Sequence, residues 1–304
     1  MKLSILIVNY NGLSVIKGCL DSVRMFCPVD SETIVVDNAS NDGSDLIIEG
    51  HYPWVKIIRS SKNLGFVGGN NLASRMATGE YFLLLNNDTI IRDSIEGVLN
   101  LIDSNQMIGA VGCRLLYGNL RLQESIGRDL RPINLALSWS SIPVFSRTVV
   151  RRSTNYGSKC FECDWVSGAF LLTRKSCWIE LGGLDDQYFM YMEDVDYCHR
   201  LRDCGKKVVY SSLCTVIHLE GSGKPWIGER ALMNTLESYS IYMNKYKMSE
   251  VNVAWLILML IFGLRSFYYF ARWVIFKSED DRCRSVAYSK GARKITTKFS
   301  PGTF

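Results

Sequence analysis

Residues 3–12 read LSILIVNYNG, an uninterrupted apolar run that ends in a short polar turn. A continuous apolar run of this length is typical of a strand that is buried on both faces of a sheet. Helical spacing follows over Leu13–Phe26, where apolar side chains recur on one side of the predicted helix. A strand followed by a helix is therefore predicted here.

The same alternation continues as far as residue 85. Further strands are predicted at Glu32–Val36, Val55–Arg59 and Tyr81–Leu85, with helices at Asp42–Glu49 and Phe66–Ala77. This order favours an α/β fold in which helices flank a mostly parallel central sheet. Ligands of such sheets bind at the carboxyl ends of the strands.

Three of the predicted strands end in polar clusters, which are Asn9–Gly12, Asp37–Gly43 and Asn86–Asp88. A single polar turn carries little weight, but three that converge on one edge of a sheet indicate a site. The first cluster lacks the Gly-x-Gly-x-x-Gly pattern of dinucleotide-binding proteins, and the chain has no Walker lysine loop. The ligand is therefore expected to be held in another way.

The second half of the chain is less regular at first. Residues Gly118–Cys163 are interpreted as a variable insertion. Patterned structure then returns with strands at Trp165–Thr173, Lys207–Ser211 and Thr215–His218 and helices near Arg174–Leu181 and Asp194–Cys204.

Composition sets broad limits on function. The 304 residues are 47% hydrophobic and 21% charged, which favours a packed core, and the net charge is only +5. No basic stripe interleaved with aromatic residues occurs in the first 250 residues, so no nucleic-acid partner is expected. Cys160 and Cys163 form a CxxC without a second pair, which disfavours structural zinc. Since no leader precedes Leu3–Val8, we expect a cytosolic, reduced protein.

Six stretches together resemble the inverting GT-A glycosyltransferases of family 2, in particular their rhamnosyltransferase-like branch. The stretches are SILIVNYNG (4–12), VVDNASNDGS (35–44), NLGFVGGNN (63–71), LLLNNDT (83–89), WVSGAFLLTRKS (165–176) and GLDDQYFMYMEDVDYCHRLRDCGKKVVY (183–210). The resemblance implies a Rossmann-like GT-A domain over residues 1–247. Its donor-binding half would cover about 1–117 and its acceptor and catalytic half about 160–247, and residues 248–304 would form an apolar helix and a basic tail.

The resemblance also assigns donor-binding roles. Asp37 is expected to accept the imide N–H of a uracil or thymine base, although a simple turn cap is its structural alternative. The resemblance places Asn9 and Asn11 at the base or ribose. The remaining donor-binding residues it implies are Asn63, Gly65 and Asn70, in a loop that opens a helix whose N-terminus favours negative charge, together with Asn87 and Asp88.

Asn86-Asn87-Asp88 occupies the place of the family's Asp-x-Asp motif, with Asp88 as its only carboxylate. By resemblance, Asp88 binds Mg²⁺ or Mn²⁺ at the donor diphosphate, and His218 completes the site. A lone histidine is more often structural than a metal ligand, so both interpretations of His218 stay open.

The run Glu193-Asp194-Val195-Asp196 supplies three carboxylates at a predicted helix start. Acidic residues there also complement the helix dipole. By resemblance, Asp194 is the general base that deprotonates the acceptor hydroxyl, with Glu193 beside it. The acceptor cleft would be lined by Trp165, Ser167 and Gly168, although Trp165 could equally belong to the core.

The most hydrophobic stretch is Val251–Leu264. A helix extended to Phe276 would be long enough to cross a bilayer but would enclose Arg265 and Arg272, each of which costs about 2.5–3.5 kcal/mol at the bilayer centre. An interfacial or partly inserted helix is therefore favoured over a clean span. Packing on the domain or on a second subunit is the alternative.

The resulting hypothesis is an inverting transferase that moves a sugar, with rhamnose from dTDP-rhamnose as the best guess, to a lipid-linked glycan in surface polysaccharide synthesis. Its expected partners are a nucleotide-sugar donor, a polyprenyl-linked or oligosaccharide acceptor, the cytoplasmic face of the plasma membrane and a second copy in a homodimer. A sugar nucleotidyltransferase and a nucleotide-sugar-binding scaffold without catalysis remain alternatives, although Asn9–Gly12 lacks the Gly-rich, basic loop of the former.

Overall fold

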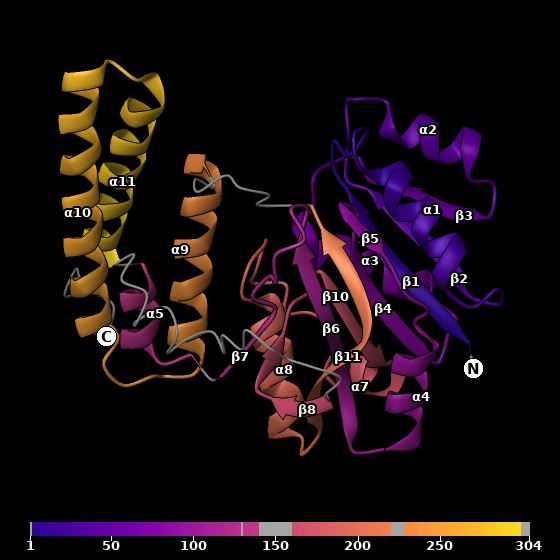
Figure 1. Cartoon of the computed structure of the whole chain (residues 1–304). Coiled ribbons are helices and arrows are strands. Elements are labelled where there is room, and N and C mark those ends of the chain that lie inside the picture. The colour runs from indigo at the N-terminus through magenta and orange to yellow at the C-terminus, as the bar shows by residue number, and fades with distance from the viewer. Residues whose placement is uncertain (1, 129, 140–159, 220–227, 299–304) are drawn as a thin grey trace. The chain divides into compact units, whose positions relative to one another are not determined.

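A computed structural model describes residues 2–128, 130–139, 160–219 and 228–298 (Figure 1). These parts pack into two compact units. Of the described residues, 2–127 and 160–219 belong to the first unit, and 128, 130–139 and 228–298 belong to the second. The predicted polar and catalytic residues all belong to the first unit.

A nine-stranded sheet forms the centre of the first unit, in the order β3-β2-β1-β4-β10-β6-β11-β5, and β8 pairs with β11 at Val208–Ser211. Its strands are β1 Leu3–Asn9, β2 Glu32–Asp37, β3 Val55–Arg59, β4 Tyr81–Asn86, β5 Thr89–Ile91, β6 Ile108–Tyr117, β8 Cys160–Cys163, β10 Phe170–Arg174 and β11 Lys207–His218. A separate two-stranded sheet pairs β7 (Ile126–Gly127) with β9 (Trp165–Val166).

The first four strands are parallel, and their register aligns their carboxyl ends. Asn9 is paired with Asp37 of β2, and Val8 with Asn86 of β4. The chain adds β2 and β3 on one side of β1 and β4 on the other, so the order of the strands reverses at β1. A reversal of this kind opens a crevice at the carboxyl ends, where ligands of α/β proteins bind.

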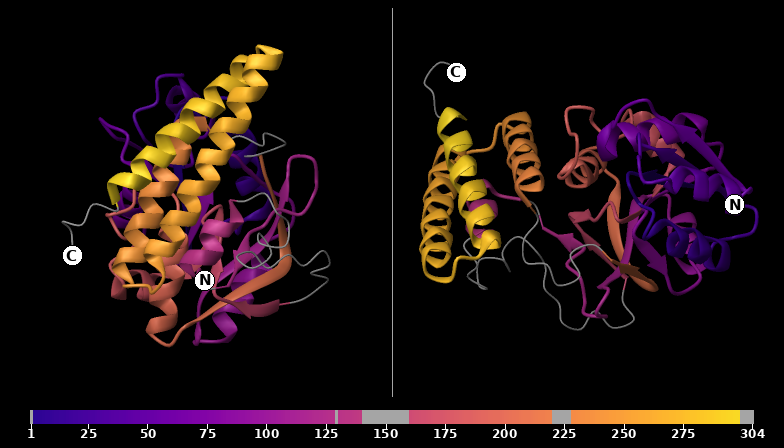
Figure 2. Two further views of the ribbon diagram at one scale, coloured as in Figure 1. Left: turned by 90° about the vertical axis from the view of Figure 1, so that its left-hand side faces the viewer. Right: turned by 90° about the horizontal axis from the view of Figure 1, so that it is seen from above.

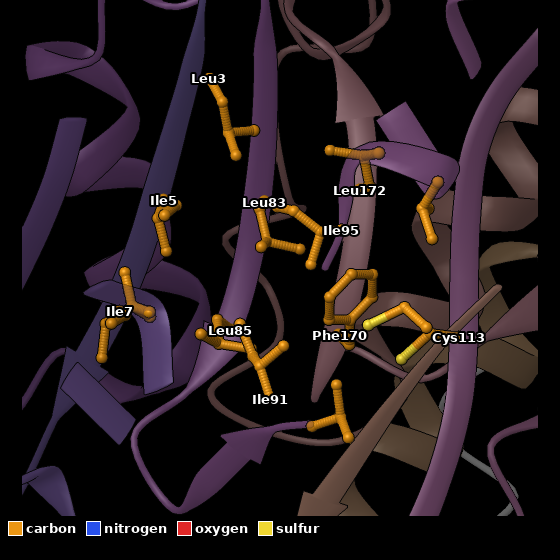
Figure 3. Packing of buried hydrophobic residues seen from close by; sticks show 14 of the residues in the cluster. Leu3, Ile5, Ile7, Leu83, Leu85, Ile91, Ile95, Cys113, Phe170 and Leu172 are labelled. Atoms are coloured by element: carbon orange, nitrogen blue, oxygen red, sulfur yellow. The ribbon is translucent and has the colours of Figure 1, made fainter. Parts of the chain in front are cut away.

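Helices cover both faces of this sheet (Figure 1). The helices of the first unit are α1 Ile16–Phe26, α2 Ser44–His51, α3 Gly65–Met76, α4 Glu96–Ser104, α7 Lys175–Glu180 and α8 Glu193–Asp203. Side chains of α1 and α4 pack on one face, against alternate residues of β1, β4 and β10 such as Ile5, Leu83 and Leu172 (Figure 3). On the opposite face, Phe82 packs edge-on against Trp178 of α7.

The predicted α/β class is confirmed, with two local differences. The expected strand Trp165–Thr173 is divided into β9 and β10, because a turn at Ser167–Ala169 interrupts it. In contrast, β11 runs unbroken through the two strands expected at Lys207–Ser211 and Thr215–His218, with a register irregularity between Ser211 and Thr215. Part of the predicted insertion, residues 140–159, lies outside the described residues.

The second unit consists of helices, α5 Pro132–Ser138, α9 Gly228–Lys245, α10 Val251–Phe276 and α11 Glu279–Lys298. In both views of Figure 2, α10 and α11 lie side by side. Leu236 of α9, Leu258 and Phe262 of α10 and Tyr288 of α11 share one core. Packing thus groups α9 with the C-terminal helices, whereas the sequence placed it in the transferase domain; the functional boundary at residue 247 stays a prediction.

α10 is long and apolar enough to cross a membrane, judged by its length and composition.

The ten cysteines are free thiols. Cys160 is exposed and Cys163 is buried, and no group of three metal-ligating side chains is present in the described part of the chain.

Candidate active site at the carboxyl edge of the sheet

A cleft of about 250 Å³ opens at the carboxyl edge of the parallel strands. Its walls come from the ends of β1, β2 and β4, the start of α3 and the loop that precedes α8. The lining residues are Val8, Tyr10, Asn38, Asn63, Gly65, Phe66, Asn86, Asn87, Asp88, Phe189 and Met190. Among these described residues Asp88 is the only carboxylate, and most of the others are amides or aromatic rings.

Asp37 is held by a hydrogen-bond network beside this cleft. Its carboxylate accepts the side-chain amide of Asn9 at 3.2 Å and the backbone N–H of Ser40 at 3.1 Å. The amide of Asn9 also donates to Ser44 at 2.8 Å. Asp37 is only 4% exposed, so these bonds fix the direction of its carboxylate.

A bridge between two amides crosses the point where the strand order reverses. The Asn87 amide donates to Oδ1 of Asn9 at 2.9 Å. A side chain at Gly12 would place its Cβ 2.2 Å from Oδ1 of Asn9 and 2.4 Å from the Asn87 amide. Gly12 is therefore required for this bridge, which joins the loops that follow β1 and β4.

The loop before α3 is tied to the loop before α8. The Asn38 amide donates to the carbonyl of Gly65 at 2.9 Å, and Asn63 accepts the N–H of Gly65 at 2.9 Å. Phe66 in turn donates its backbone N–H to the carbonyl of Phe189 at 2.9 Å. Gly65 has φ +75°, and a Cβ there would lie 2.3 Å from the carbonyl oxygen of Phe189.

We expect Gly65→Ala to weaken donor binding and to destabilise the fold by about 1–3 kcal/mol, because it combines backbone strain with a collision against Phe189. Gly43→Ala is the matched control, since Gly43 has φ +79° with nothing within 4 Å of the added Cβ. Thermal unfolding and the KM for the donor measure both effects. Equal behaviour of the two variants would show that the contact with Phe189 is unimportant.

Asp88 and His218 meet in space although they are remote in the sequence. Oδ1 of Asp88 lies 3.2 Å from Nε2 of His218. Antiparallel pairing of β5 with β11 aligns Thr89 with His218 and so brings the residue before Thr89 to the histidine. The His218 side chain is 6% exposed and that of Asp88 20%, so the pair is open to the cleft on the Asp88 side.

The hydrogen bonds around His218 indicate which of its ring nitrogens carries the proton. Nδ1 lies 3.1 Å from Oε1 of Gln123, and Nε2 lies 3.1 Å from the amide nitrogen of Asn86. Nδ1 therefore carries the proton in the tautomer assigned from this network, and Nε2 accepts the N–H of the Asn86 amide while it lies 3.2 Å from Oδ1 of Asp88. Two facing acceptors suit a divalent cation, and a second hydrogen bond through the other ring nitrogen is usual for metal-binding histidines. The two side chains fit a metal ion that takes its remaining ligands from a diphosphate.

Asp194 lies at the same edge of the sheet. Its Oδ2 accepts the N–H of Gly168 at 2.8 Å, and its Oδ1 accepts that of Val195 at 2.8 Å. The next residue after Gly168, Ala169, accepts the N–H of Asn86 at the end of β4. Burial raises the pKa of Asp194, and the two N–H donors oppose that rise. A raised pKa suits a carboxylate that must accept a proton.

Glu193 is buried, and its Oε2 has no hydrogen-bond partner among the residues that the structure describes. Burial, and then the charge of Asp194, raise the pKa of Glu193 well above its ordinary value. Asp196 has a different role: it accepts Nε of Arg200 at 2.7 Å, while the same guanidinium donates to the carbonyls of Leu181 and Gly183. Asp196 and Arg200 thus secure the loop that leads toward the cleft.

Several predicted residues do not line this cleft. Asn9 is fully buried and makes its bonds within the protein, and Asn11 accepts the N–H of Asn41 on the surface. Asn70 is 1% exposed and donates to the carbonyl of Phe66. Trp165 lies against the backbone of Gly127 in the small β7–β9 sheet. Ser167 accepts the N–H of Ala169 and shapes the turn that carries Gly168.

The structure also identifies residues that the sequence did not single out for the site. Gln123 belongs to the segment expected to be a variable insertion, and no local pattern marks it as a partner of His218. Asn38, Phe66 and Phe189 lie inside the quoted sequence stretches, so those stretches already contained their signal.

Comparisons with known proteins agree on one family. The family model described as "Glycosyl transferase family 2" matches residues 4–166. The chain is 26% identical over 234 residues, 71% of its length and 75% of the relative's, to "N-acetylglucosaminyl-diphospho-decaprenol L-rhamnosyltransferase" of Mycobacterium tuberculosis. It is 27% identical to "Rhamnosyltransferase WbbL" of Escherichia coli, over 70% of this chain and 82% of that one.

Solved structures show a similar fold. A GalNAc-T7 structure with UDP, GalNAc and Mn²⁺ has a TM-score of 0.60 at 17% identity, covering 99% of this chain and 58% of that one. A mannosyltransferase of Pyrobaculum calidifontis with GDP-Man and Mn²⁺ has a TM-score of 0.59 at 14% identity, covering 97% of this chain and 86% of that one.

Proposed function

Because the chain belongs to glycosyl transferase family 2 and is a glycosyltransferase, we propose that it moves a sugar from a nucleoside-diphosphate donor to a lipid-linked glycan with inversion. The donor base contacts Asp37, whose carboxylate is held in place by Asn9 and Ser40. Tyr10 and Asn38 form the wall near the base and ribose. Asn63, Gly65 and Asn87 shape the cleft on the diphosphate side.

Asp88 and His218 hold a divalent ion, Mg²⁺ or Mn²⁺, at the diphosphate. The facing Oδ1 and Nε2 atoms support this assignment, and the two solved structures compared above contain Mn²⁺. Such an ion, when bound, neutralises the charge that builds up on the departing diphosphate.

Asp194 is the general base. Inversion is a single displacement, so one group must accept the proton of the acceptor hydroxyl on the side opposite the leaving nucleotide. The N–H groups of Gly168 and Val195 orient the carboxylate of Asp194. Ser167 and Gly168 form the acceptor side of the site, and Trp165 supports them from β9.

The donor sugar is rhamnose, carried as dTDP-rhamnose, and the acceptor is a polyprenyl diphosphate-linked glycan of surface polysaccharide synthesis. The names of the M. tuberculosis and E. coli relatives support the sugar, and the name of the former supports the lipid. An acceptor of this kind places the enzyme at the cytoplasmic face of the plasma membrane, where it works as a peripheral protein.

The pairing of Asp88 with His218 at the mouth of an amide-lined cleft carries this proposal. The test is to incubate the purified protein with dTDP-rhamnose, UDP-glucose, UDP-N-acetylglucosamine and GDP-mannose, each with a membrane extract and Mg²⁺ or Mn²⁺. We expect metal-dependent transfer of radiolabel to the lipid fraction from dTDP-rhamnose. Transfer from another donor would show that the donor sugar is not rhamnose. If the nucleotides bound but neither transfer nor slow donor hydrolysis occurred, the alternative of a non-catalytic scaffold would be favoured.

A further inference from the structure

The side of α10 that faces away from its neighbours is apolar from end to end. Its exposed side chains follow one another at intervals of three or four residues, which places them on one face of a helix. We call this face the α10 stripe: Val253, Leu256, Leu260, Leu264, Phe267, Phe270 and Val274. It is about 32 Å long at 1.5 Å per residue. Leu264 and Phe267 are each 71% exposed, and an apolar surface of this extent marks a contact with a partner or a membrane.

The two arginines within α10 lie on its other side. Arg265 donates to the hydroxyl of Tyr288 in α11 at 2.6 Å, and Arg272 donates to Asp281 in α11 at 3.1 Å. Both charges are therefore engaged by α11, and none interrupts the α10 stripe. In the sequence these two arginines disfavour a helix that spans the bilayer, but neither of them lies on the face that would contact a membrane surface.

The charges of α11 limit how deeply the hairpin formed by α10 and α11 can enter a bilayer. It packs along α10 (Figure 2) and carries nine charged residues, Glu279, Asp280, Asp281, Arg282, Arg284, Lys290, Arg293, Lys294 and Lys298. If α10 crossed a bilayer, these charges would enter the hydrocarbon with it, at a large cost for each. Lying in the plane of the surface buries the α10 stripe and leaves α11 in water.

A groove beside the α10 stripe contains basic side chains, which would favour an anionic membrane surface. This groove of about 630 Å³ is lined by Phe267 and Phe270 of α10 and by Ser289, Lys290 and Arg293 of α11. Lys290 is paired with Glu229 at 2.7 Å. Within the described residues, the exposed guanidinium of Arg293 has no ion-pair partner. Segment 277–298 holds seven basic and three acidic residues, a net charge of +4, which complements an anionic surface.

We propose that the α10–α11 hairpin docks in the plane of a bilayer containing anionic phospholipid, with the α10 stripe among the acyl chains and Arg293 at a lipid phosphate. The idea rests on the proposed work at a membrane, but it specifies the surface, the orientation and the lipid charge.

The test is flotation of the full chain with vesicles of phosphatidylcholine alone or mixed with phosphatidylglycerol. We expect wild-type protein to float with the mixed vesicles. Leu264→Gln should lower the partition coefficient about tenfold on both kinds of vesicle. Its control is Leu46→Gln, because Leu46 on α2 is 65% exposed. Arg293→Gln should lower it about fivefold on the mixed vesicles only, with exposed Arg75→Gln as the control.

Three outcomes would overturn the proposal. If Leu264→Gln floated as well as the wild type, the α10 stripe would not contact the membrane. Resistance of the chain to alkaline carbonate extraction from membranes would indicate a spanning helix. A dimer in light scattering that Leu264→Gln converts to a monomer, without vesicle binding by the wild type, would make a second copy the occupant. Donor hydrolysis measured without vesicles in the same preparations tests the transferase function separately.

Discussion

Replacing Asp194 with Asn is expected to reduce turnover by about 10²-fold or more while nucleotide binding stays intact. The amide cannot accept a proton from the acceptor, but it has the size of the carboxylate and its oxygen can still accept the N–H of Gly168. The measurement is kcat with saturating donor and acceptor, together with calorimetric binding of the nucleoside diphosphate.

Asp203→Asn is the matched control for this change. Asp203 ends the helix that Glu193 begins, and its side chain is 63% exposed. It is expected to leave turnover unchanged. If Asp194→Asn kept full turnover, another group would have to act as the base, and the acceptor side of the site would need a new assignment.

The pH dependence follows from the same carboxylate. The base acts only when it is deprotonated, so kcat should fall as the pH is lowered through the pKa of Asp194. Burial raises that pKa, and the acid limb of the profile should therefore lie above the value of about 3.9 for an ordinary aspartate. Glu193→Gln retains the shape of a protonated Glu193, so it should preserve this limb and reduce turnover far less than Asp194→Asn. Loss of the limb in Glu193→Gln would move the proton-accepting role to Glu193.

Much of the fold could be predicted because its strands are buried on both faces. LSILIV and YFLLL have no other plausible place than the centre of a sheet. The helical spacing of the segments between them predicts the alternation of strands and helices. The three-residue strand β5 offers no periodicity, and the pairing that it makes with β11 depends on the whole sheet. The break at Ser167–Ala169 was also invisible, since a buried turn between two apolar segments has no charged residue to mark it.

The candidate site was predictable to the extent that its residues follow strands. The sequence pattern predicts Asp37 and Asp88 at strand ends, and both lie at the edge of the sheet that is expected to bind ligands. The contact between Asn86 and His218 joins residues 132 positions apart, and Gln123 reaches His218 across 95 positions. Such contacts are produced by tertiary packing, so only the resemblance indicated His218, and nothing indicated Gln123. The orientation of Arg265 and Arg272 toward α11 was hidden for the same reason.

Asp88→Asn is expected to lower kcat/KM for the donor by about 10²-fold and to raise the metal concentration needed for half-maximal activity. The cleft has no second carboxylate in its described lining, so no neighbour can replace the lost charge. In the wild type, Mn²⁺ should tighten the binding of UDP or dTDP, measured by calorimetry. Asp88→Asn should largely lose this enhancement, and His218→Gln should lose part of it.

Asp30→Asn controls for the change in net charge, because Asp30 is exposed in the loop that enters β2 and therefore lies at the opposite edge of the sheet. It should keep both activity and the metal enhancement. The comparison of the Asp88 and His218 variants is informative because the two side chains contribute differently. The carboxylate supplies charge, whereas the imidazole supplies the lone pair of Nε2, and Gln123 orients the ring by accepting the N–H of Nδ1. If Asp88→Asn kept the full enhancement by Mn²⁺, the ion would be bound by the diphosphate alone, and the meeting of Asp88 with His218 would serve the fold instead of the chemistry.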